Sequence, residues 1–201
     1  MTLSKRLFDL ACALALGLIL LPMMAVVAVV VLVLDGRPVL YISERMSAPK
    51  TPFALIKFRT MKASDQNAGV SGGDKSSRIT RTGNFLRRSR IDELPQLWNV
   101  IRGDISFVGP RPPLRLYVER YPEIYDRVLK SRPGITGLAS VYFHRHEEHL
   151  LATCNTAEET DTVYAHRCIP RKAHIDLLYQ ARQSVCLDIS IMFKTVFKFL
   201  R

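Results

Sequence analysis

The stretch Leu10–Leu34, LACALALGLILLPMMAVVAVVVLVL, contains no charged residue. At 1.5 Å per residue it would reach about 37 Å as a straight helix, which exceeds the ~30 Å hydrocarbon core of a bilayer. It is longer than the ~7–15 apolar residues of a secretory signal, and no small-residue cleavage site follows it. The stretch therefore predicts a membrane-associated helix.

Pro22 lies near the middle of this run and predicts a bend, because proline removes a backbone hydrogen bond and clashes with the preceding turn. The helix could span the membrane with a kink. It could instead enter and leave by one face as a re-entrant hairpin, with halves of ~18 Å. Basic residues, which prefer the cytoplasmic side, flank both ends and favour the re-entrant form: Lys5, Arg6, Arg37, Arg45, Lys50, Lys57 and Arg59.

The chain has 201 residues, and its 29 Lys and Arg residues against 18 Asp and Glu residues give a net charge of +11. This excess points to nucleic acid, anionic lipid or phosphorylated substrates as partners. The four cysteines form no CxxC pair, which fits a reducing cytosol better than a disulfide framework. We expect a membrane-associated helix over residues 1–36 and one small basic cytosolic domain over residues 37–201.

Two short extended segments, Pro38–Ile42 and Phe53–Phe58, follow the membrane run, with a loop at Pro49 and Pro52 between them. The expected fold class is α+β, mainly helical, with a short β-hairpin. Lys57 and Arg59 share one face of the second segment, where they could hold a diphosphate or simply form a solvated edge. The polar, glycine-containing stretch Met61–Ser77 predicts a flexible loop and a candidate lid.

The segment Arg87–Val100, RRSRIDELPQLWNV, combines cations, two adjacent acids and apolar positions suited to an inward helix face. Asp92 and Glu93 are expected at the start of that helix, with Pro95 in its first turn. One acid could attack phosphorus while its neighbour holds Mg²⁺, which usually takes one or two carboxylates plus substrate phosphates. The alternative is a capped helix whose acids pair weakly with Arg87 and Arg88.

The segment Gly103–Pro113 begins with a glycine that should end this helix. Pro110 and Pro112 flank Arg111, fix the local backbone and so aim a guanidinium that can bind phosphate bidentately. A rigid turn carrying a charged surface residue is the alternative.

These motifs together resemble the bacterial sugar transferase family, the small monotopic phosphoglycosyl transferases. The resemblance covers nearly the whole chain: Lys-Arg-x-Phe-Asp at 5–9, the apolar run with its proline, Lys-Phe-Arg-Thr-Met at 57–61, RIDELPQLWNV at 90–100, Gly-Asp-x-Ser-x-Val-Gly-Pro-Arg-Pro at 103–112, Arg-Pro-Gly-Ile-Thr-Gly at 132–137, and Asp188 and Thr195. Two departures are the missing glycines between Arg45 and Phe53, and Leu21 in place of a serine before the proline.

The resemblance implies transfer of a sugar-1-phosphate from a UDP-sugar to polyprenyl (undecaprenyl) phosphate at the cytoplasmic face of the bacterial inner membrane, with release of UMP. Asp92 is then the nucleophile and Glu93 the Mg²⁺ ligand. Basic positions around the diphosphate and the turn near the nucleotide are implied as substrate-binding: Lys57, Arg59, Arg87, Pro110, Arg111 and Pro112. Membrane lipids and a second copy of the chain are further expected partners.

The C-terminal third is less informative. The His- and Cys-containing segment 144–174 matches no closed metal-site pattern and is interpreted as polar helix and loop. Leu187–Arg201 suits a helix at the bilayer interface or one docked on the core. A non-catalytic membrane scaffold that binds anionic lipid or partner transferases is the alternative function. Nucleic-acid binding ranks last, because the chain lacks aromatic-basic interleaving.

Overall fold

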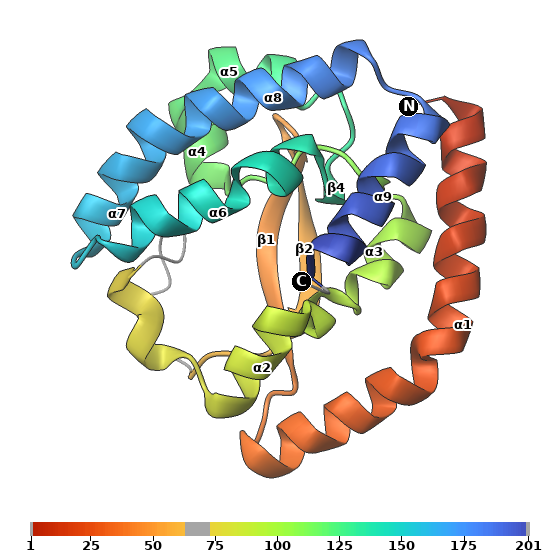
Figure 1. The fold of residues 1–201 in the computed structure, drawn as a ribbon, viewed down its shortest axis with the longest axis vertical. Helices are drawn as coiled ribbons and strands as arrows, with labels where there is room; N and C mark the ends of the chain where they lie inside the picture. Colours follow the sequence, from red (N-terminus) through yellow and green to blue (C-terminus); the bar gives the residue numbers. More distant parts are fainter. Residues whose placement is uncertain (1, 63–72, 200–201) are drawn as a thin grey trace.

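A computed structural model describes residues 2–62 and 73–199. The chain is mainly helical (66%), with a small central hairpin surrounded by helices (Figure 1). In chain order the elements are α1 (Leu3–Leu34), β1 (Leu40–Ala48), β2 (Thr51–Phe58), η1 (Gly73–Arg78), α2 (Arg81–Ser89), η2 (Ile91–Glu93), α3 (Gln96–Arg102), β3 (Ser106–Val108), α4 (Arg115–Arg120), α5 (Pro122–Val128), β4 (Gly134–Thr136), α6 (Leu138–Ala152), α7 (Ala157–Val163), η3 (Tyr164–Cys168), α8 (Ile169–Ala181) and α9 (Val185–Phe199). The predicted mainly helical fold with a hairpin is confirmed.

The antiparallel hairpin is longer than the sequence predicted. β1 pairs with β2 from Leu40 opposite Phe58 to Ala48 opposite Thr51. Pro52 lies inside β2 rather than in the loop, because both strands of a two-stranded sheet are edges, where a missing N–H is tolerated. Because β1 extends to Ala48, Arg45 is a strand residue.

A second, parallel pair was not predicted: Ser106 of β3 lies opposite Gly134 of β4. Strands of three residues give no alternation to recognise. At the end of β3, a Cβ on Gly109 would lie only 2.1 Å from the Arg132 carbonyl oxygen, so this close approach requires glycine. The pairing fixes the turn that carries Arg111.

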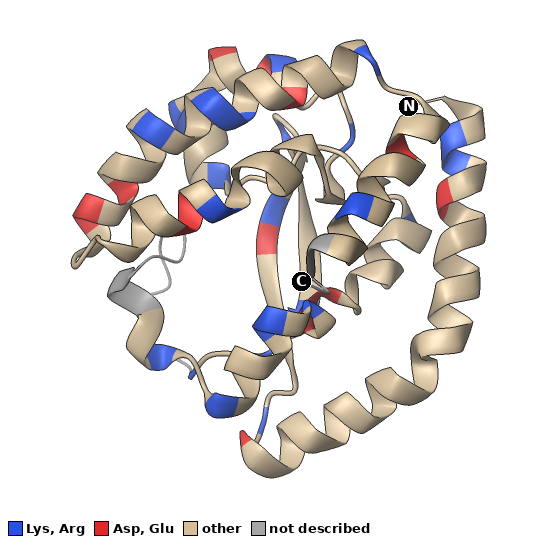
Figure 2. Cartoon of the chain, in the orientation of Figure 1, with Lys and Arg blue, Asp and Glu red and all other residues tan. Residues whose placement is uncertain are grey.

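Helix α1 is the one helix among the described residues that is long and apolar enough to cross a membrane. It contains Pro22 and bends part-way along its length in Figure 1. Its charged residues lie near its beginning, and the rest of the helix carries none (Figure 2).

Ala13 packs into the core near α3 and β3, whereas Val31 packs against Phe58 and Leu86. Both ends thus contact the same domain, and large apolar side chains between them are exposed: Leu14, Leu18, Ile19, Leu21, Val26 and Val29.

The beginning of α1 is fixed by buried polar contacts. Lys5 donates to the Val108 carbonyl at 3.1 Å and forms an ion pair with Asp188 of α9. Arg6 donates to the Val100 and Ile101 carbonyls, at 2.7 and 2.8 Å, at the end of α3. Treating Lys5 as a membrane-flanking charge was therefore wrong, because it is only 2% exposed and pairs within the protein.

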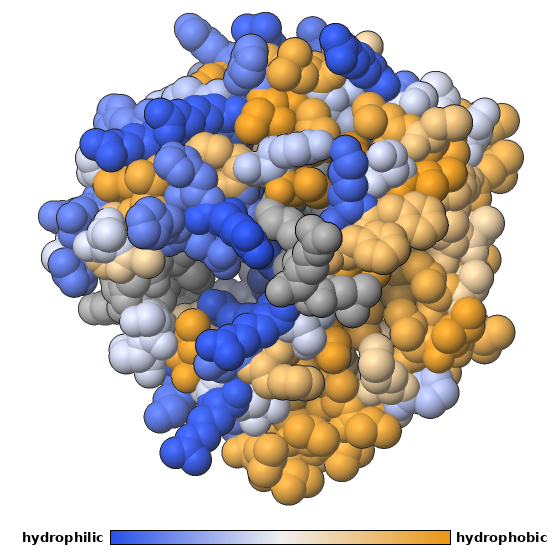
Figure 3. All heavy atoms as spheres, viewed as in Figure 1, coloured by the Kyte–Doolittle hydropathy of each residue, from blue (hydrophilic) through white to orange (hydrophobic). Residues whose placement is uncertain are grey.

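The C-terminal elements enclose the hairpin from one side. Helices α5, α6 and α8 share a core that includes Tyr125, Phe143 and Ile169. Helix α9 buries Ile191 but exposes Phe193, Val196 and Phe197. The placement of α9 at a bilayer stays a prediction. Figure 3 shows a hydrophobic surface at the right and the bottom of the view, where Figure 1 places α1. Residues 63–72 of the loop predicted at Met61–Ser77 lie outside the described residues.

Candidate active site

The two adjacent acids lie in a short 3₁₀ turn, η2, between α2 and α3. Arg90 ends α2 in the left-handed conformation at φ 57° and turns the chain toward them. The prediction that the acids begin the helix was wrong, because they lie in η2, the turn before α3. Pro95 cannot donate to the Ile91 carbonyl, which instead accepts from the Leu94 N–H at 3.2 Å, so the regular helix begins only at Gln96.

Helix α3 holds this turn against the core with Leu97 and Val100, as predicted. Gly103 ends the helix at φ 89°, also as predicted. Trp98 was expected to face inward, but it is 55% exposed. A helix of seven residues has one narrow inward face, which Leu97 and Val100 already occupy.

Glu93 is held by cations. Its Oε1 accepts from Arg111 at 3.1 Å and from Arg90 at 3.4 Å. Burial alone would raise the pKa of Glu93, but the positive charges of Arg111, Arg90 and Lys57 lower it below its usual value. Glu93 is therefore ionised at neutral pH and fixed in orientation.

Asp92 differs from its neighbour. It is 6% exposed, and its Oδ1 is buried without a hydrogen-bond partner among the described residues. Burial raises the pKa of Asp92, and the adjacent Glu93 adds to the rise. An open acceptor in a buried carboxylate carries a desolvation cost, which a bound phosphorus or cation could offset.

The acids line a cavity of about 1270 Å³ that also reaches Leu16 and Leu20 of α1. This exceeds the ~300–1000 Å³ typical of small-molecule sites. Several side chains line it that have a buried polar atom without a partner within residues 2–62 and 73–199: Ser43, Arg45, Arg59, Asp92 and Asp176. Two others, Asp9 and Ser106, lie outside its lining. Because buried polar groups are normally paired, this concentration marks the cavity as a site for a polar ligand.

The predicted cations are partly gathered here. Lys57 lines the cavity, and burial, with help from Arg111, lowers its pKa to about 8. Arg87 donates from Nε to the Thr60 hydroxyl at 3.0 Å and also lines the cavity. Arg111 is about 40% exposed and reaches Glu93 from the turn after β3.

Arg59 and Pro112 also line the cavity, whereas Pro110 does not. Arg59 lines the cavity, but it donates to the Asp35 and Gly36 carbonyls at 2.5 and 2.8 Å, where α1 ends. Pro112 lines the cavity, whereas Pro110 lies outside the lining and accepts from the Gly134 N–H at 2.9 Å. The Pro110 carbonyl thus joins β4, and the contact of Pro110 with substrate stays a prediction.

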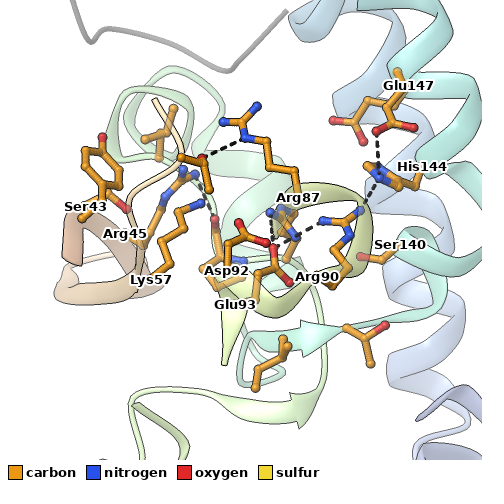
Figure 4. A pocket seen from close by; sticks show the side chains of 18 of the residues that line it. Ser43, Arg45, Lys57, Arg87, Arg90, Asp92, Glu93, Ser140, His144 and Glu147 are labelled. Carbon is orange, nitrogen blue, oxygen red and sulfur yellow. Dashed lines mark hydrogen bonds and ion pairs between the residues drawn. The ribbon is translucent and has the colours of Figure 1, made fainter. Parts of the chain in front are cut away.

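Sequence reasoning missed several side chains of the cavity, among them Arg45, Arg90 and His144. Arg45 donates to the Pro112 carbonyl at 3.3 Å, and it was overlooked because a loop was expected there. Its signal was alternation, since Ser43, Arg45 and Lys57 share the inward face of the hairpin (Figure 4). Arg90 and His144, which Arg90 contacts across the cavity, were likewise not assigned.

The acids also fit a magnesium ion. Within residues 2–62 and 73–199, no group of three or more His, Cys, Asp and Glu residues could hold a metal. Mg²⁺ needs fewer protein ligands, because it usually binds one or two carboxylates together with substrate phosphates and waters. The open Oδ1 of Asp92 beside ionised Glu93 meets that requirement.

Comparison with known proteins gives consistent matches. The family described as "Bacterial sugar transferase" matches residues 1–201. The chain is 34% identical over 200 residues to UDP-glucose:undecaprenyl-phosphate glucose-1-phosphate transferase of Escherichia coli, covering 98% of this chain and 40% of that protein. It is 33% identical over 208 residues to UDP-galactose-lipid carrier transferase of Erwinia amylovora, covering 96% and 39%.

A third relative is UDP-N-acetylgalactosamine-undecaprenyl-phosphate N-acetylgalactosaminephosphotransferase of Aeromonas hydrophila, 32% identical over 198 residues, with 96% and 42% covered. The chain thus spans about two fifths of the length of these relatives. Their names specify three different sugars, so similarity alone does not select a donor.

Proposed function

The chain belongs to the bacterial sugar transferase family, and on that premise we propose that it transfers a sugar-1-phosphate from a UDP-sugar to a polyprenyl phosphate. Two of the relatives' names describe transfer of a sugar phosphate to undecaprenyl phosphate, and the third names a UDP-galactose-lipid carrier transferase. The observation that carries the proposal is the buried, open Oδ1 of Asp92 beside Arg-bound Glu93 in a cation-lined cavity.

In the first step, Asp92 attacks the phosphorus that bears the sugar. The new bond joins this phosphorus to a carboxylate oxygen, and the bond to the oxygen bridging the two phosphates breaks. UMP leaves with that electron pair, and the sugar phosphate stays on Asp92 as an acyl phosphate ester. Lys57, Arg87 and Arg111 neutralise the diphosphate, and phosphoryl transfer depends mainly on such positioning and charge.

In the second step, a phosphate oxygen of the polyprenyl phosphate attacks the same phosphorus. The bond to Asp92 breaks, which restores the carboxylate and yields a polyprenyl diphosphate sugar. A bound Mg²⁺, held by Glu93 with a contribution from Asp92, would add positive charge at the phosphates. We place this reaction as the first membrane step in the synthesis of a surface glycan.

The lipid substrate suggests the topology of α1. Because Ala13 and Val31 both pack on the same domain, a re-entrant helix keeps that domain on one membrane face. A straight span would carry one end of the helix ~30 Å away to the other face. Leu16 and Leu20 of α1 line the cavity and give a lipid tail an apolar approach to Asp92. We place the domain at the cytoplasmic face of the inner membrane.

The test is release of UMP from a panel of UDP-sugars by the purified protein with Mg²⁺ and undecaprenyl phosphate. Acid-quenched reactions lacking the lipid should contain a sugar-phosphate adduct on the peptide with Asp92, detected by mass spectrometry. No UMP from any donor, together with tight binding to anionic vesicles, would support the scaffold function instead. An adduct on another residue would reject the assignment of the nucleophile.

A further inference from the structure

Opposite the hairpin, which contributes Arg45 and Lys57, the cavity is lined by residues of α6 and α8 that include two carboxylates, Glu147 and Asp176. We call this side the wall. Glu147 of α6 accepts from Lys172 of α8 at 2.9 and 3.1 Å, and Lys172 also donates to the Tyr164 hydroxyl at 3.4 Å. All three residues line the cavity. The single lysine is matched by its glutamate, so this wall has no excess positive charge.

Asp176 of α8 is the unsatisfied member of this wall. It is 6% exposed, lines the cavity, and has a buried Oδ1 without a partner in the described part of the chain. Its carboxylate accepts a backbone hydrogen bond from Ala139 at the start of α6. Burial raises the pKa of Asp176 to about 7, opposed by Lys172. The open oxygen calls for an O–H or N–H donor from a ligand.

This wall faces the acid pair. Ser140, His144 and Glu147 lie at i, i+4 and i+7 on one face of α6, and Figure 4 shows them across from Asp92 and Glu93. Arg90 spans the gap, since it contacts both Glu93 and His144.

The electrostatic interactions of Arg111 also indicate that the wall lies near the acid pair. Glu93 is the main cause of the raised pKa of Arg111, and Glu147 contributes as well. Arg111 therefore lies within reach of both the acid pair and the wall.

The chemistry of the wall suits hydroxyl groups better than a phosphate. Carboxylates at Glu147 and Asp176 would repel an anion, and Lys172 is already paired with Glu147. Sugar hydroxyls can donate to carboxylates, and hydrogen bonds to charged groups are the stronger ones. In a UDP-sugar, the sugar is attached to the phosphorus that Asp92 would attack, so it must lie next to the acid pair. The nucleoside lies beyond the second phosphate.

We propose that Asp176, supported by Glu147 and Ser140, accepts hydroxyl groups of the donor's sugar and selects among UDP-sugars. The inference rests on the proposed function and deepens it by naming the part of the donor that this wall reads. A pocket that hydrogen-bonds a hydroxyl rejects donors that lack it in the right place, because its own polar group is then left unpaired.

The experiment compares Asp176→Asn with the wild type, both as full-length protein in detergent. Asn has nearly the volume of Asp and keeps an oxygen for the Ala139 N–H, so α6 should fold normally. We measure dissociation constants for UMP, UDP-glucose, UDP-galactose and UDP-N-acetylgalactosamine by calorimetry. We expect about tenfold weaker binding of the preferred UDP-sugar, or about 1.4 kcal/mol, and UMP binding unchanged within twofold.

The kcat/KM ratio between donors should also change, whereas general damage would lower all donors alike. Asp126→Asn, an exposed aspartate on α5, is the matched control and should equal the wild type. Equal weakening of UMP would overturn the proposal, because the wall would then read the nucleoside. Unchanged binding of every donor would also overturn it and leave Asp176 as a cap of α6.

Measurements on the wild type distinguish a failure of the proposed sugar subsite from a failure of the proposed function. If the wild type binds UDP-sugars but releases no UMP, the proposed function fails, and the binding comparison still judges the sugar subsite. If it releases UMP and Asp176→Asn behaves as the wild type, only the sugar subsite fails.

Discussion

Two buried charge clusters in this chain differ in how completely their polar groups are paired. At the beginning of α1, the Lys5 ammonium contacts Val108, Tyr179 and Asp188, and Tyr179 donates to the other Asp188 oxygen at 2.6 Å. In the cavity, Asp92 is nearly as buried but keeps an oxygen without a partner among the described residues.

The difference separates a structural cluster from the cluster that we propose to be catalytic. A fully paired ion cluster offers nothing to a substrate, but it is strongly destabilised when one partner is removed. An unpaired buried carboxylate costs stability and is available for chemistry. The Lys5 cluster should therefore control folding, whereas the Asp92 cluster should control turnover.

The largest expected effect is that of Asp92→Asn on turnover. Removing the proposed nucleophile should lower kcat on the order of 10⁴-fold or more. The same change removes a buried negative charge, so the melting temperature should stay the same or rise. UMP release and a thermal melt of the same preparation measure both. Residual turnover near the wild-type level would end the assignment, because asparagine cannot form the ester.

The converse experiment is Lys5→Met. It leaves Asp188 buried without its cation and should destabilise the protein by about 3–5 kcal/mol, seen as a melting temperature lower by roughly 10 °C. The double variant Lys5→Met/Asp188→Leu should recover most of the loss, because apolar replacement of a whole pair is often tolerated. A single variant as stable as the wild type would show that the cluster does not anchor α1.

The sequence predicted those parts of the fold that depend on residues close together in the chain. The charge-free run predicted α1, and Gly103 predicted the end of α3. The prolines beside Arg111 predicted only a rigid turn that carries a guanidinium. Its position at the diphosphate was implied by the family resemblance, and in the structure Arg111 contacts Glu93. The acids were singled out because one short segment combines them with arginines and apolar positions, and the family resemblance then implied their roles.

Long-range placement was not predictable. Nothing in the sequence near Lys5 indicates that Asp188 will lie against it, 183 residues away. Pro110 and Arg111 are adjacent, yet only Arg111 reaches the cavity, since the Pro110 carbonyl joins β4. Asp176 was missed because its role depends on how α8 packs against α6.

A smaller effect is expected for Arg111→Lys. A lysine keeps the charge but loses the planar fork that holds Glu93 at 3.1 Å, so kcat/KM should fall about 10–100-fold. Arg115→Lys is the matched control, because Arg115 also pairs with a glutamate, Glu44, but at the surface. It should stay within twofold of the wild type. Equal losses in both variants would argue against a special role for Arg111.

The smallest effect concerns pH. With a pKa of about 8, Lys57 is charged in about nine of ten molecules at pH 7 and in about one of ten at pH 9. Donor binding should therefore weaken severalfold as pH rises through 8, which appears as a higher KM. The bound diphosphate favours the charged lysine and raises its pKa, so kcat should change less than KM.

The sign of this effect distinguishes Lys57 from the acids. Glu93 has a lowered pKa and stays ionised throughout this range, while protonation of Asp92 would reduce activity as pH falls, in the opposite direction. Lys57→Arg should remove the rise in KM above pH 8, because arginine keeps its charge there. A rise that persists in Lys57→Arg would assign it to another group and place Lys57 outside the diphosphate site.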